Sequence, residues 1–572
     1  MKQNWKIKER TSLDKRIFPG LEEEIEKLLI DREVLNLEEK KAFLEPGYES
    51  ESIDPFLLTD MDLAVNRVLS AIEKKEKICV YGDYDADGVT ASALLLDFFG
   101  QIDIETVAYL PDRATEGYGV NCDALDYIKE KEVTLMITVD CGVSNADEIE
   151  YGKKIAIDSI ILDHHHLPEN VPSAIAVVDP KRDGDVYPNK DLAGVGVAFK
   201  FLQALVSKMD DYDEEQLKWL LDLVAIGTIA DCVKLSQENR MLVRYGLVVL
   251  SRTRRIGLHH MFQVGKISID PSSVPSSFTV SFQIAPRINA AGRMDHANTA
   301  QKLLLCNEFQ ESQARLLALE IEDKNKHRQK ITAQIVDDVF AQVKKNEKEK
   351  IIIKSSPNWN FGVVGLAAGR VAEAFHRPTI LFQEYEKDGE RLARASCRSI
   401  SQFNMVKALE RNKDILLKYG GHSQAAGLTI KESDLNQFKE RMLAEMKDVD
   451  EKDLIKEILI DLEVSFDRIT NKLIEELELL EPYGMGNVKP IFCCKNLSVT
   501  QVRKVGATEA HLKLQFQNGE QGNTLDAIGF SIAKKFRNLK EGDVVDLAFN
   551  LEMNEWNGNR NPQAMVIDID IQ

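Results

Sequence analysis

The chain has 572 residues, enough for several domains, and its hydrophobic content of 44% is that of a globular protein with real cores. No apolar run reaches the ~18 residues of a membrane span, so we expect neither a membrane segment nor a secretory leader. A net charge of −20 argues against a protein that coats nucleic acid, but not against a nuclease, whose acidic ligands are neutralised locally by bound ions. The eight cysteines form no C-x-x-C pair, which favours a reducing cytoplasm.

The first half of the chain predicts a parallel sheet. After a charged, helical segment over residues 1–50, treated as an N-terminal appendage, short apolar runs alternate with helical patterns. The runs are 78–81, 135–139, 160–162 and 174–178. Ligands of such sheets bind beyond the carboxyl ends of the strands, and Asp83, Asp140 and Asp163 all fall at those ends. The coincidence favours one shared site.

The second half predicts three further parts. Residues 312–345 have the apolar spacing of one long amphipathic helix, which either bridges two domains or packs on one. A second α/β region follows, and after an acidic linker short alternating runs punctuated by glycines predict a small β-barrel. We expect an N-terminal appendage over 1–50, a catalytic α/β domain over 51–300 and a connecting helix over 301–349. A second α/β domain over 350–447 and a barrel with its preceding junction over 456–572 would follow.

Four acidic and histidine clusters predict one metal site. The alternating Asp83, Asp85 and Asp87 form either a set of hard-cation ligands or a solvated acidic turn, and no closing glutamate completes a calcium loop. Asp140 taken alone is most often a turn or cap residue. Asp163 precedes three histidines, of which His164 and His165 are candidate metal ligands, and Asp163 would orient a ligating ring.

Asp231 and several cationic residues complete the candidate set. Asp231 ends an apolar, helix-like stretch, where a carboxylate is costly unless it is paired or bound to a metal. Arg287 and Arg293 frame a basic segment, Ser396 lies two residues before Arg398, and His422 follows a glycine pair. Guanidinium groups and glycine-rich loops bind phosphate. Acids and imidazoles beside such groups indicate metal-assisted hydrolysis of a phosphoester.

These motifs, in this order, resemble the DHH phosphoesterase superfamily. The resemblance is carried by residues 83–87, Asp140, residues 163–165 and Asp231, and by residues 359–365 and 420–422 in the associated region. Residues 285–293 and 482–487, followed by the barrel, are similar within that superfamily to the RecJ family of single-strand-specific exonucleases. Asn360 and Ala395 depart from the usual histidine and glycine of the family.

The resemblance implies a 5′→3′ exonuclease that hydrolyses single-stranded DNA to mononucleotides in repair and recombination. It implies two divalent ions, Mn²⁺ or alternatively Mg²⁺, with Asp140 bridging them and His165 beside the scissile phosphate. The implied metal ligands are Asp83, Asp85, Asp87, Asp140, His164 and Asp231. The 5′ phosphate would be held by Arg113, Ser396 and Arg398, and the strand by Arg287 and His422.

Two other functions stay open at this point. One is a DHH hydrolase of small substrates such as cyclic dinucleotides or short oligonucleotides, which would normally lack the barrel. The other is an inert single-strand-binding scaffold, which the complete set of acids disfavours. The implied partners are single-stranded DNA with a 5′ phosphate, a single-strand-binding protein and a RecQ-type helicase.

Overall fold

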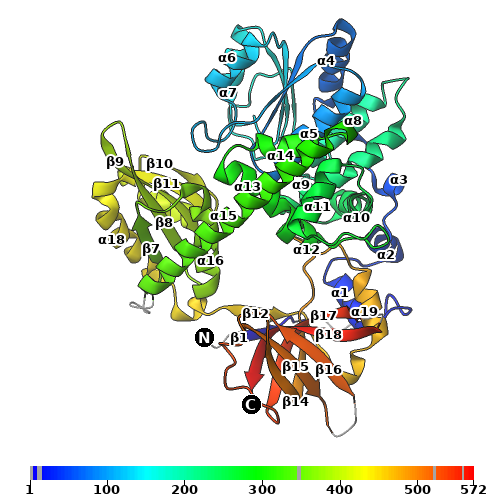
Figure 1. Ribbon diagram of the computed structural model, residues 1–572, viewed down its shortest axis with the longest axis vertical. Helices are drawn as coiled ribbons and strands as arrows, with labels where there is room; N and C mark the ends of the chain where they lie inside the picture. The colour runs from blue at the N-terminus through cyan, green and yellow to red at the C-terminus, as the bar shows by residue number, and fades with distance from the viewer. Residues whose placement is uncertain (1–3, 10–15, 344–348, 520–522, 557–558) are drawn as a thin grey trace. The chain divides into compact units, whose positions relative to one another are not determined.

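A computed structural model describes residues 4–9, 16–343, 349–519, 523–556 and 559–572 (Figure 1). The chain forms two compact units. The larger contains Ile53–Asp231 and Gly246–Lys456. The smaller contains Met1–Ser52, Cys232–Tyr245 and Glu457–Gln572. No helix of the described residues is long and apolar enough to cross a membrane.

The larger unit contains the expected parallel sheet. Its strand order is β3-β2-β4-β5-β6, and every neighbouring pair is parallel. The strands are β2 (Ile78–Gly82), β3 (Thr106–Tyr109), β4 (Leu135–Val139), β5 (Asp158–Leu162) and β6 (Ala176–Val178). Figure 1 shows α6 (Cys122–Glu130) and α7 (Ala146–Lys154) on one face, and α4 (Met61–Lys74) and α8 (Gly194–Val206) on the other. Because both faces are covered, the strands read as continuous apolar runs.

Helices follow the sheet and lead to the long helix α15 (Glu311–Val343), which has 33 residues. The preceding helices are α5 (Ala86–Gln101), α9 (Leu221–Ala230), α11 (Ile256–Gly265), α12 (Ser277–Thr279), the π-helix η3 (Val280–Ile284), α13 (Ala285–Met294) and α14 (Asn298–Leu304). Helix α15 packs against α11, α13 and α14 along one part and against α16 (Phe361–Phe375) along another, as Figure 1 shows. It therefore connects the two α/β regions; the last two residues of the expected helix lie outside the described residues.

The second α/β region is a mixed sheet of order β10-β11-β9-β8-β7. Only the β7–β8 pair is parallel. Its strands are β7 (Ile352–Ser356), β8 (Thr379–Lys387), β9 (Glu390–Arg398), β10 (Lys418–Gly421) and β11 (Ala425–Lys431). Its further helices are α17 (Met405–Arg411) and α18 (Leu435–Glu445). The expected acidic linker contains two short 3-10 turns, η7 (Met446–Asp448) and η8 (Glu451–Leu454).

The smaller unit is built on a closed barrel, as expected of an OB-type domain. The strand order is β14-β15-β16-β18-β17, and β17 pairs with β14 to close the ring, while β13 (Leu462–Glu463) adds to its edge. The barrel strands are β14 (Phe492–Val505), β15 (His511–Gln517), β16 (Thr524–Gly529), β17 (Val544–Trp556) and β18 (Asn559–Ile571). Closure leaves few unpaired edges.

The N-terminal segment belongs to the core of the barrel unit. Phe18, Ile25 and Leu29 pack in one hydrophobic cluster with barrel residues. The helices here are α1 (Glu23–Ile30), α2 (Leu37–Leu44), α3 (Tyr48–Glu51), α19 (Asn471–Glu478) and α10 (Gln237–Ser251), the last of which crosses from one unit to the other. The helical pattern expected through residue 50 is wrong for β1 (Asn4–Ile7), which pairs in parallel with β12 (Glu457–Ile460).

Candidate metal centre and substrate pocket

The first acidic cluster is fixed by the starts of two helices. Asp85 caps α5, because its Oδ1 accepts hydrogen bonds from the backbone N–H groups of Asp87 (2.9 Å) and Gly88 (3.2 Å). Asp87, in the first turn of α5, is itself buried and accepts hydrogen bonds from Gly194 N (2.7 Å) and Val195 N (2.9 Å) at the start of α8. Helix N-termini stabilise negative charge. The starts of two helices, and not a calcium-binding loop, therefore fix the orientation of Asp85 and Asp87.

Asp140 follows β4 in a left-handed backbone conformation, with φ of 60°. Its N–H donates to Leu162 O at 3.0 Å, which ties the turn to the neighbouring strand β5. A Cβ at Gly194 would lie 2.6 Å from the Asp140 Cβ, so only glycine lets α8 approach here. The Asp140 Oδ1 then lies 3.1 Å from His164 Nε2.

The predicted ligands come together in three overlapping groups, each with ligand atoms within 4.8 Å of one another. The groups are Asp83, Asp85 and Asp140; Asp87, His164 and Asp231; and Asp140, His164 and His165. Asp140 and His164 each belong to two groups. The structure therefore gathers every acid and imidazole that the sequence singled out as a ligand, and Asp140 and His164 link the three groups.

The electrostatics of this cluster fit divalent cations. Burial, reinforced by neighbouring carboxylates, raises the pKa of Asp83 and Asp140 well above the ordinary range. Burial and the nearby Asp231 raise the pKa of Asp87 to about 7, and burial and Asp85 raise the pKa of Asp231 to about 7. Buried carboxylates this close need a counter-charge.

Two polar atoms of the cluster are left without partners. Asp83 Oδ1 and His164 Nδ1 are buried and have no hydrogen-bond partner among the described residues. Burial lowers the pKa of His164, which favours the neutral imidazole that ligates metals. An unpaired carboxylate oxygen and a neutral imidazole are the donor types that Mn²⁺ accepts, and oxygen donors suit Mg²⁺.

His165 is held by Asp163 beside the cluster. Asp163 Oδ1 lies 2.8 Å from His165 Nδ1 and accepts from the backbone N–H of His164 at 2.7 Å. Burial opposes the charged imidazole, but the hydrogen bond and charge of Asp163 outweigh burial and raise the pKa of His165 to about 9. Tyr118 Oη lies 3.1 Å from the same Nδ1. A cationic imidazole is therefore oriented at the edge of the acidic cluster.

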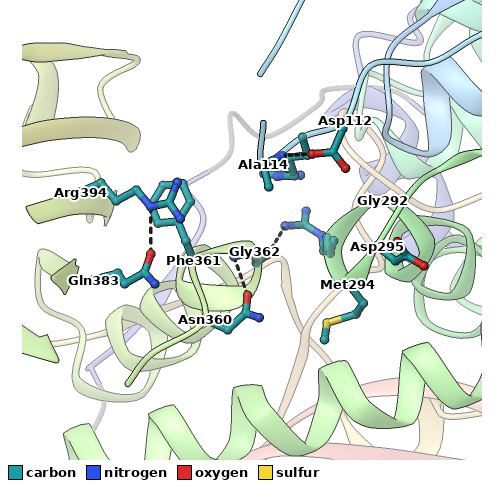
Figure 2. Close-up of a pocket in the computed structure, with 12 residues that line it drawn as sticks. Asp112, Ala114, Gly292, Met294, Asp295, Asn360, Phe361, Gly362, Gln383 and Arg394 are labelled. Atoms are coloured by element: carbon teal, nitrogen blue, oxygen red, sulfur yellow. Dashed lines mark hydrogen bonds between the residues drawn. The ribbon is translucent and has the colours of Figure 1, made fainter. Parts of the chain in front are cut away.

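A pocket of about 250 Å³ opens in the same unit, lined on both sides by guanidinium groups. Arg113 follows β3 and Arg293 lies on α13, whereas Arg394 comes from β9, as labelled in Figure 2. Figure 2 shows Arg394 stacked on Phe361, with its carbon Cζ 4.2 Å from the ring centroid and its Nε 2.9 Å from Gln383 Oε1. Burial, followed by the charge of Arg113, lowers the pKa of Arg293 to about 10. Crowded cations of this kind favour an anionic ligand.

The side chains of Ser396 and Arg398, two residues apart on β9, contact one another. Arg398 Nη1 donates to Ser396 Oγ at 3.2 Å and to Cys397 O at 2.8 Å. Burial lowers the pKa of Arg398, and the charge of Arg113 lowers it further. Asn360, where the family usually has histidine, caps α16 by accepting from Gly362 N at 2.9 Å and lines the pocket.

Two predicted substrate contacts lie elsewhere. Arg287 Nε donates to Glu322 Oε2 on α15 at 2.8 Å, and its other nitrogens donate to the carbonyls of Gln283 and Gly265. His422 lies in the exposed turn between β10 and β11, where its N–H donates to Ala425 O. Contact of either residue with DNA stays a prediction, and the Arg287 side chain already has a structural role.

Sequence reasoning missed Arg394 and Tyr118, and it noted Arg293 without assigning it. A signal existed for Arg394, because alternation along a strand places Arg394, Ser396 and Arg398 on one face of β9. The same alternation puts buried Ala395 and Cys397 on the other face. Tyr118 is separated from His165 by 47 residues and carries no local signal.

A doubly covered parallel sheet whose strands end in carboxylates and an imidazole, beside a guanidinium pocket, is the arrangement of a metal-dependent phosphoesterase. Residues 77–228 match the N-terminal domain of the DHH family, residues 348–448 the DHHA1 domain, and residues 460–568 the RecJ OB domain. The chain belongs to the RecJ family.

Three relatives illustrate this similarity. The single-stranded-DNA-specific exonuclease RecJ of Bacillus subtilis is 38% identical over 95% of this chain and 67% of its own length. The Haemophilus influenzae protein of the same name is 35% identical over 90% of this chain and 91% of its own length. The crystal structure of Thermus thermophilus RecJ with Mn²⁺ matches with a TM-score of 0.83 at 27% identity, and the match covers 99% of this chain and 79% of that one. The structure of the same protein with Mg²⁺ matches with a TM-score of 0.76 at 26% identity, and the match covers 99% of this chain and 78% of that one.

Proposed function

We propose that this chain is a metal-dependent exonuclease specific for single-stranded DNA, which removes mononucleotides from the 5′ end during repair and recombination. Membership of the RecJ family supports the substrate and the reaction class. The observation that carries the mechanism is the overlap of the three ligand groups through Asp140 and His164, in the same unit as the guanidinium pocket. The overlap supports two ions side by side.

One ion would be held by Asp83, Asp85 and Asp140, and the other by Asp87, His164 and Asp231, with Asp140 shared. Such ions, Mn²⁺ or Mg²⁺, supply Lewis acidity to the attacking water and the phosphoester and neutralise the charge that develops. The protein's own part is to fix these acids before the ions arrive. The helix starts that hold Asp87 and the strand that holds Asp140 perform this task.

His165 would contact the scissile phosphate. Its raised pKa keeps it cationic near neutral pH, and Asp163 fixes its orientation. A positioned cation stabilises the extra negative charge of the transition state more than that of the substrate. His165 is therefore the side chain we assign to charge stabilisation, and Asp163 acts through it.

The 5′→3′ direction of digestion would come from the guanidinium pocket. Arg113 and Arg293 on one side and Arg394 on the other leave room for an anion, and Ser396 and Arg398 lie on the same face of β9 as Arg394. A terminal 5′ phosphate carries more charge than an internal phosphodiester and would bind there best. The next phosphodiester would then lie at the acidic cluster.

The barrel supports binding of a longer single strand, because OB barrels bind strands by stacking and backbone contacts. A single-strand-binding protein and a RecQ-type helicase, implied by the resemblance, remain predicted partners.

Kinetics on a matched pair of single-stranded oligonucleotides, one with a 5′ phosphate and one with a 5′ hydroxyl, test this function. Arg394→Ala and Arg398→Ala should each reduce the preference for the 5′ phosphate about tenfold or more, because each removes a charge-assisted contact of ~1.5–3 kcal/mol. Arg391→Ala is the matched control: it also lies on β9, but its side chain is 75% exposed and pairs with Glu432.

Two results would contradict the proposal. Retention of the full 5′-phosphate preference in both pocket variants would move the 5′ site elsewhere. Hydrolysis of cyclic dinucleotides by the wild-type protein at rates comparable to single-stranded DNA would favour the small-substrate phosphodiesterase.

A further inference from the structure

The segment that follows Asp231 is held by a loop from the C-terminal part of the chain. This junction loop comprises residues 482–487. Its Met485 O accepts a hydrogen bond from Leu235 N at 2.8 Å. A Cβ at Gly484 would lie 2.6 Å from Leu235 Cδ1, and a Cβ at Gly486, whose φ is 77°, would lie 3.2 Å from Lys234 Cβ. The two glycines therefore allow the loop to lie directly against residues 234 and 235.

The junction loop is rigid by its own hydrogen bonds. Asn487 is buried, and its Nδ2 donates to Leu480 O at 2.7 Å and Pro482 O at 2.9 Å, while its Oδ1 accepts from Arg32 Nε at 2.6 Å. Gly484 and Asn487 exchange two backbone hydrogen bonds of 2.9 and 3.1 Å. Buried amides satisfied in this way stabilise a single loop conformation. The loop therefore presents the Met485 carbonyl to the backbone N–H of Leu235 in a single conformation.

Arg240 fixes the far end of the same segment. Its guanidinium is buried, stacks 4.0 Å from the Phe43 ring centroid and donates to Phe43 O (2.8 Å) and Glu481 O (2.7 Å). Residues 235 and 240 are both anchored in the smaller unit, so the chain between Asp231 and α10 has little freedom to move.

Asp231 receives little support from contacts of its own side chain. In the described part of the chain its carboxylate makes no hydrogen bond, and its nearest ionic partner is His164 Nε2 at 3.7 Å. Asp87, by contrast, is held by two backbone N–H groups. The Asp231 side chain is also 26% exposed, against 1% for Asp87. Its position must therefore come from its backbone, which α9 fixes on one side and residues 232–235 on the other.

We propose that the junction loop is a positioning element for Asp231 and so sets the affinity of the ion that Asp231 helps to hold. The link is covalent: Cys232, in a left-handed conformation with φ of 61°, turns the chain from Asp231 into the anchored segment. Displacing Leu235 moves the Asp231 backbone and weakens the ion held with Asp87 and His164. This inference rests on the assignment of Asp231 as a ligand in the proposed function.

The test is direct Mn²⁺ binding to the full chain without DNA, followed by electron paramagnetic resonance of free Mn²⁺. Gly484→Ala, which pushes against Leu235, should weaken one of two Mn²⁺ sites about tenfold and leave the other unchanged. Gly486→Ala, a smaller disturbance, should act in the same direction. In activity assays the Mn²⁺ concentration for half-maximal rate should rise, saturating Mn²⁺ should restore kcat, and KM for a short oligonucleotide should not change.

Two controls separate positioning from general destabilisation. Met485→Ala removes a side chain that is 59% exposed but keeps the carbonyl that binds Leu235. Gly542→Ala imposes the same kind of backbone strain, at φ of 90°, on a barrel turn with no atom near the added Cβ. Both should bind Mn²⁺ like the wild type, even if their Tm falls.

Asp231→Asn distinguishes the possible failures. If Asp231→Asn weakens a Mn²⁺ site but Gly484→Ala and Gly486→Ala bind normally, the positioning role is overturned and the ligand stands. If Gly484→Ala and Met485→Ala weaken binding equally, the effect is not specific to the glycine contact and the role is again overturned. If Asp231→Asn itself binds two ions normally, the ligand assignment in the proposed function fails.

Discussion

Asp140 lies where the backbone has positive φ, a conformation that asparagine also tolerates, so Asp140→Asn changes charge with little change of shape. Removing one of several crowded carboxylates should raise the Tm in EDTA. The same change should abolish the increase in Tm that Mn²⁺ gives the wild type, which at 100 times Kd corresponds to about 2.7 kcal/mol. Hydrolysis should be lost as well.

Thermal unfolding with EDTA and with Mn²⁺ measures this effect. Asp123→Asn, an exposed acid on α6, is the control and should leave both Tm values unchanged. A wild-type increase in Tm retained by Asp140→Asn would show that Asp140 does not bridge the ions.

At this scale the sequence predicted the acids better than the cations. Asp83, Asp140 and Asp163 each follow a short apolar run, and the carboxyl ends of parallel strands converge, so a local pattern was enough. Arg287 and Arg394 show the limit. Both are arginines beside a recognised motif, but one is paired with Glu322 and the other lines the pocket, and only the packing of α15 and β9 distinguishes them.

The Arg287–Glu322 ion pair joins helix α13 to helix α15. Both side chains are only 11% exposed, so Glu322→Gln would leave a nearly buried guanidinium without its counter-charge. We expect a loss of ~3 kcal/mol in the free energy of unfolding of the larger unit, the cost of breaking a buried pair. Urea denaturation followed by circular dichroism measures it.

Lys326→Ala is the matched control, because Lys326 also pairs with Glu322 but is 68% exposed. Its substitution should change stability little. Equal stability of Glu322→Gln and the wild type would mean that Arg287 is free to serve the substrate, as the sequence predicted.

Elements with strong periodicity were predicted well, and elements that depend on distant pairing were not. The long helix, most barrel strands and the strands β2, β4, β5 and β6 follow from runs and spacing, whereas β3 was not among the expected runs. Strand β1 does not follow from such runs either, because four residues carry too little pattern and its strand identity comes from β12, more than 450 positions along the chain. Helix α10 has an ordinary helical pattern, and nothing local indicates that it crosses between units.

The whole molecule cannot be divided at residue 456 without damage. The N-terminal helices and the barrel share one hydrophobic cluster, and Arg240 hydrogen-bonds to the carbonyl of Glu481. A chain ending at Lys456 would expose Phe18, Ile25 and Leu29 and would deprive Arg240 of its Glu481 carbonyl partner. We expect this truncation to aggregate and to be cleaved rapidly within residues 16–52.

Size-exclusion chromatography and limited proteolysis of the truncated and full chains check this prediction. A second truncation that also lacks residues 1–52 is the comparison, and it should aggregate less because the apolar helices are gone. A monomeric, protease-resistant chain ending at Lys456 would contradict the shared core.

The assembly of the barrel unit from three separated stretches has a consequence for biosynthesis. The ribosome releases the N-terminal helices first, but the barrel-unit residues that share a hydrophobic cluster with α1 begin at Leu462. Roughly 400 residues must be made in between, which at about 5–20 residues per second takes some 20–80 s. During that time the apolar face of α1 lacks the barrel residues that cover it. The nascent chain therefore exposes a chaperone-binding segment until its last domain emerges.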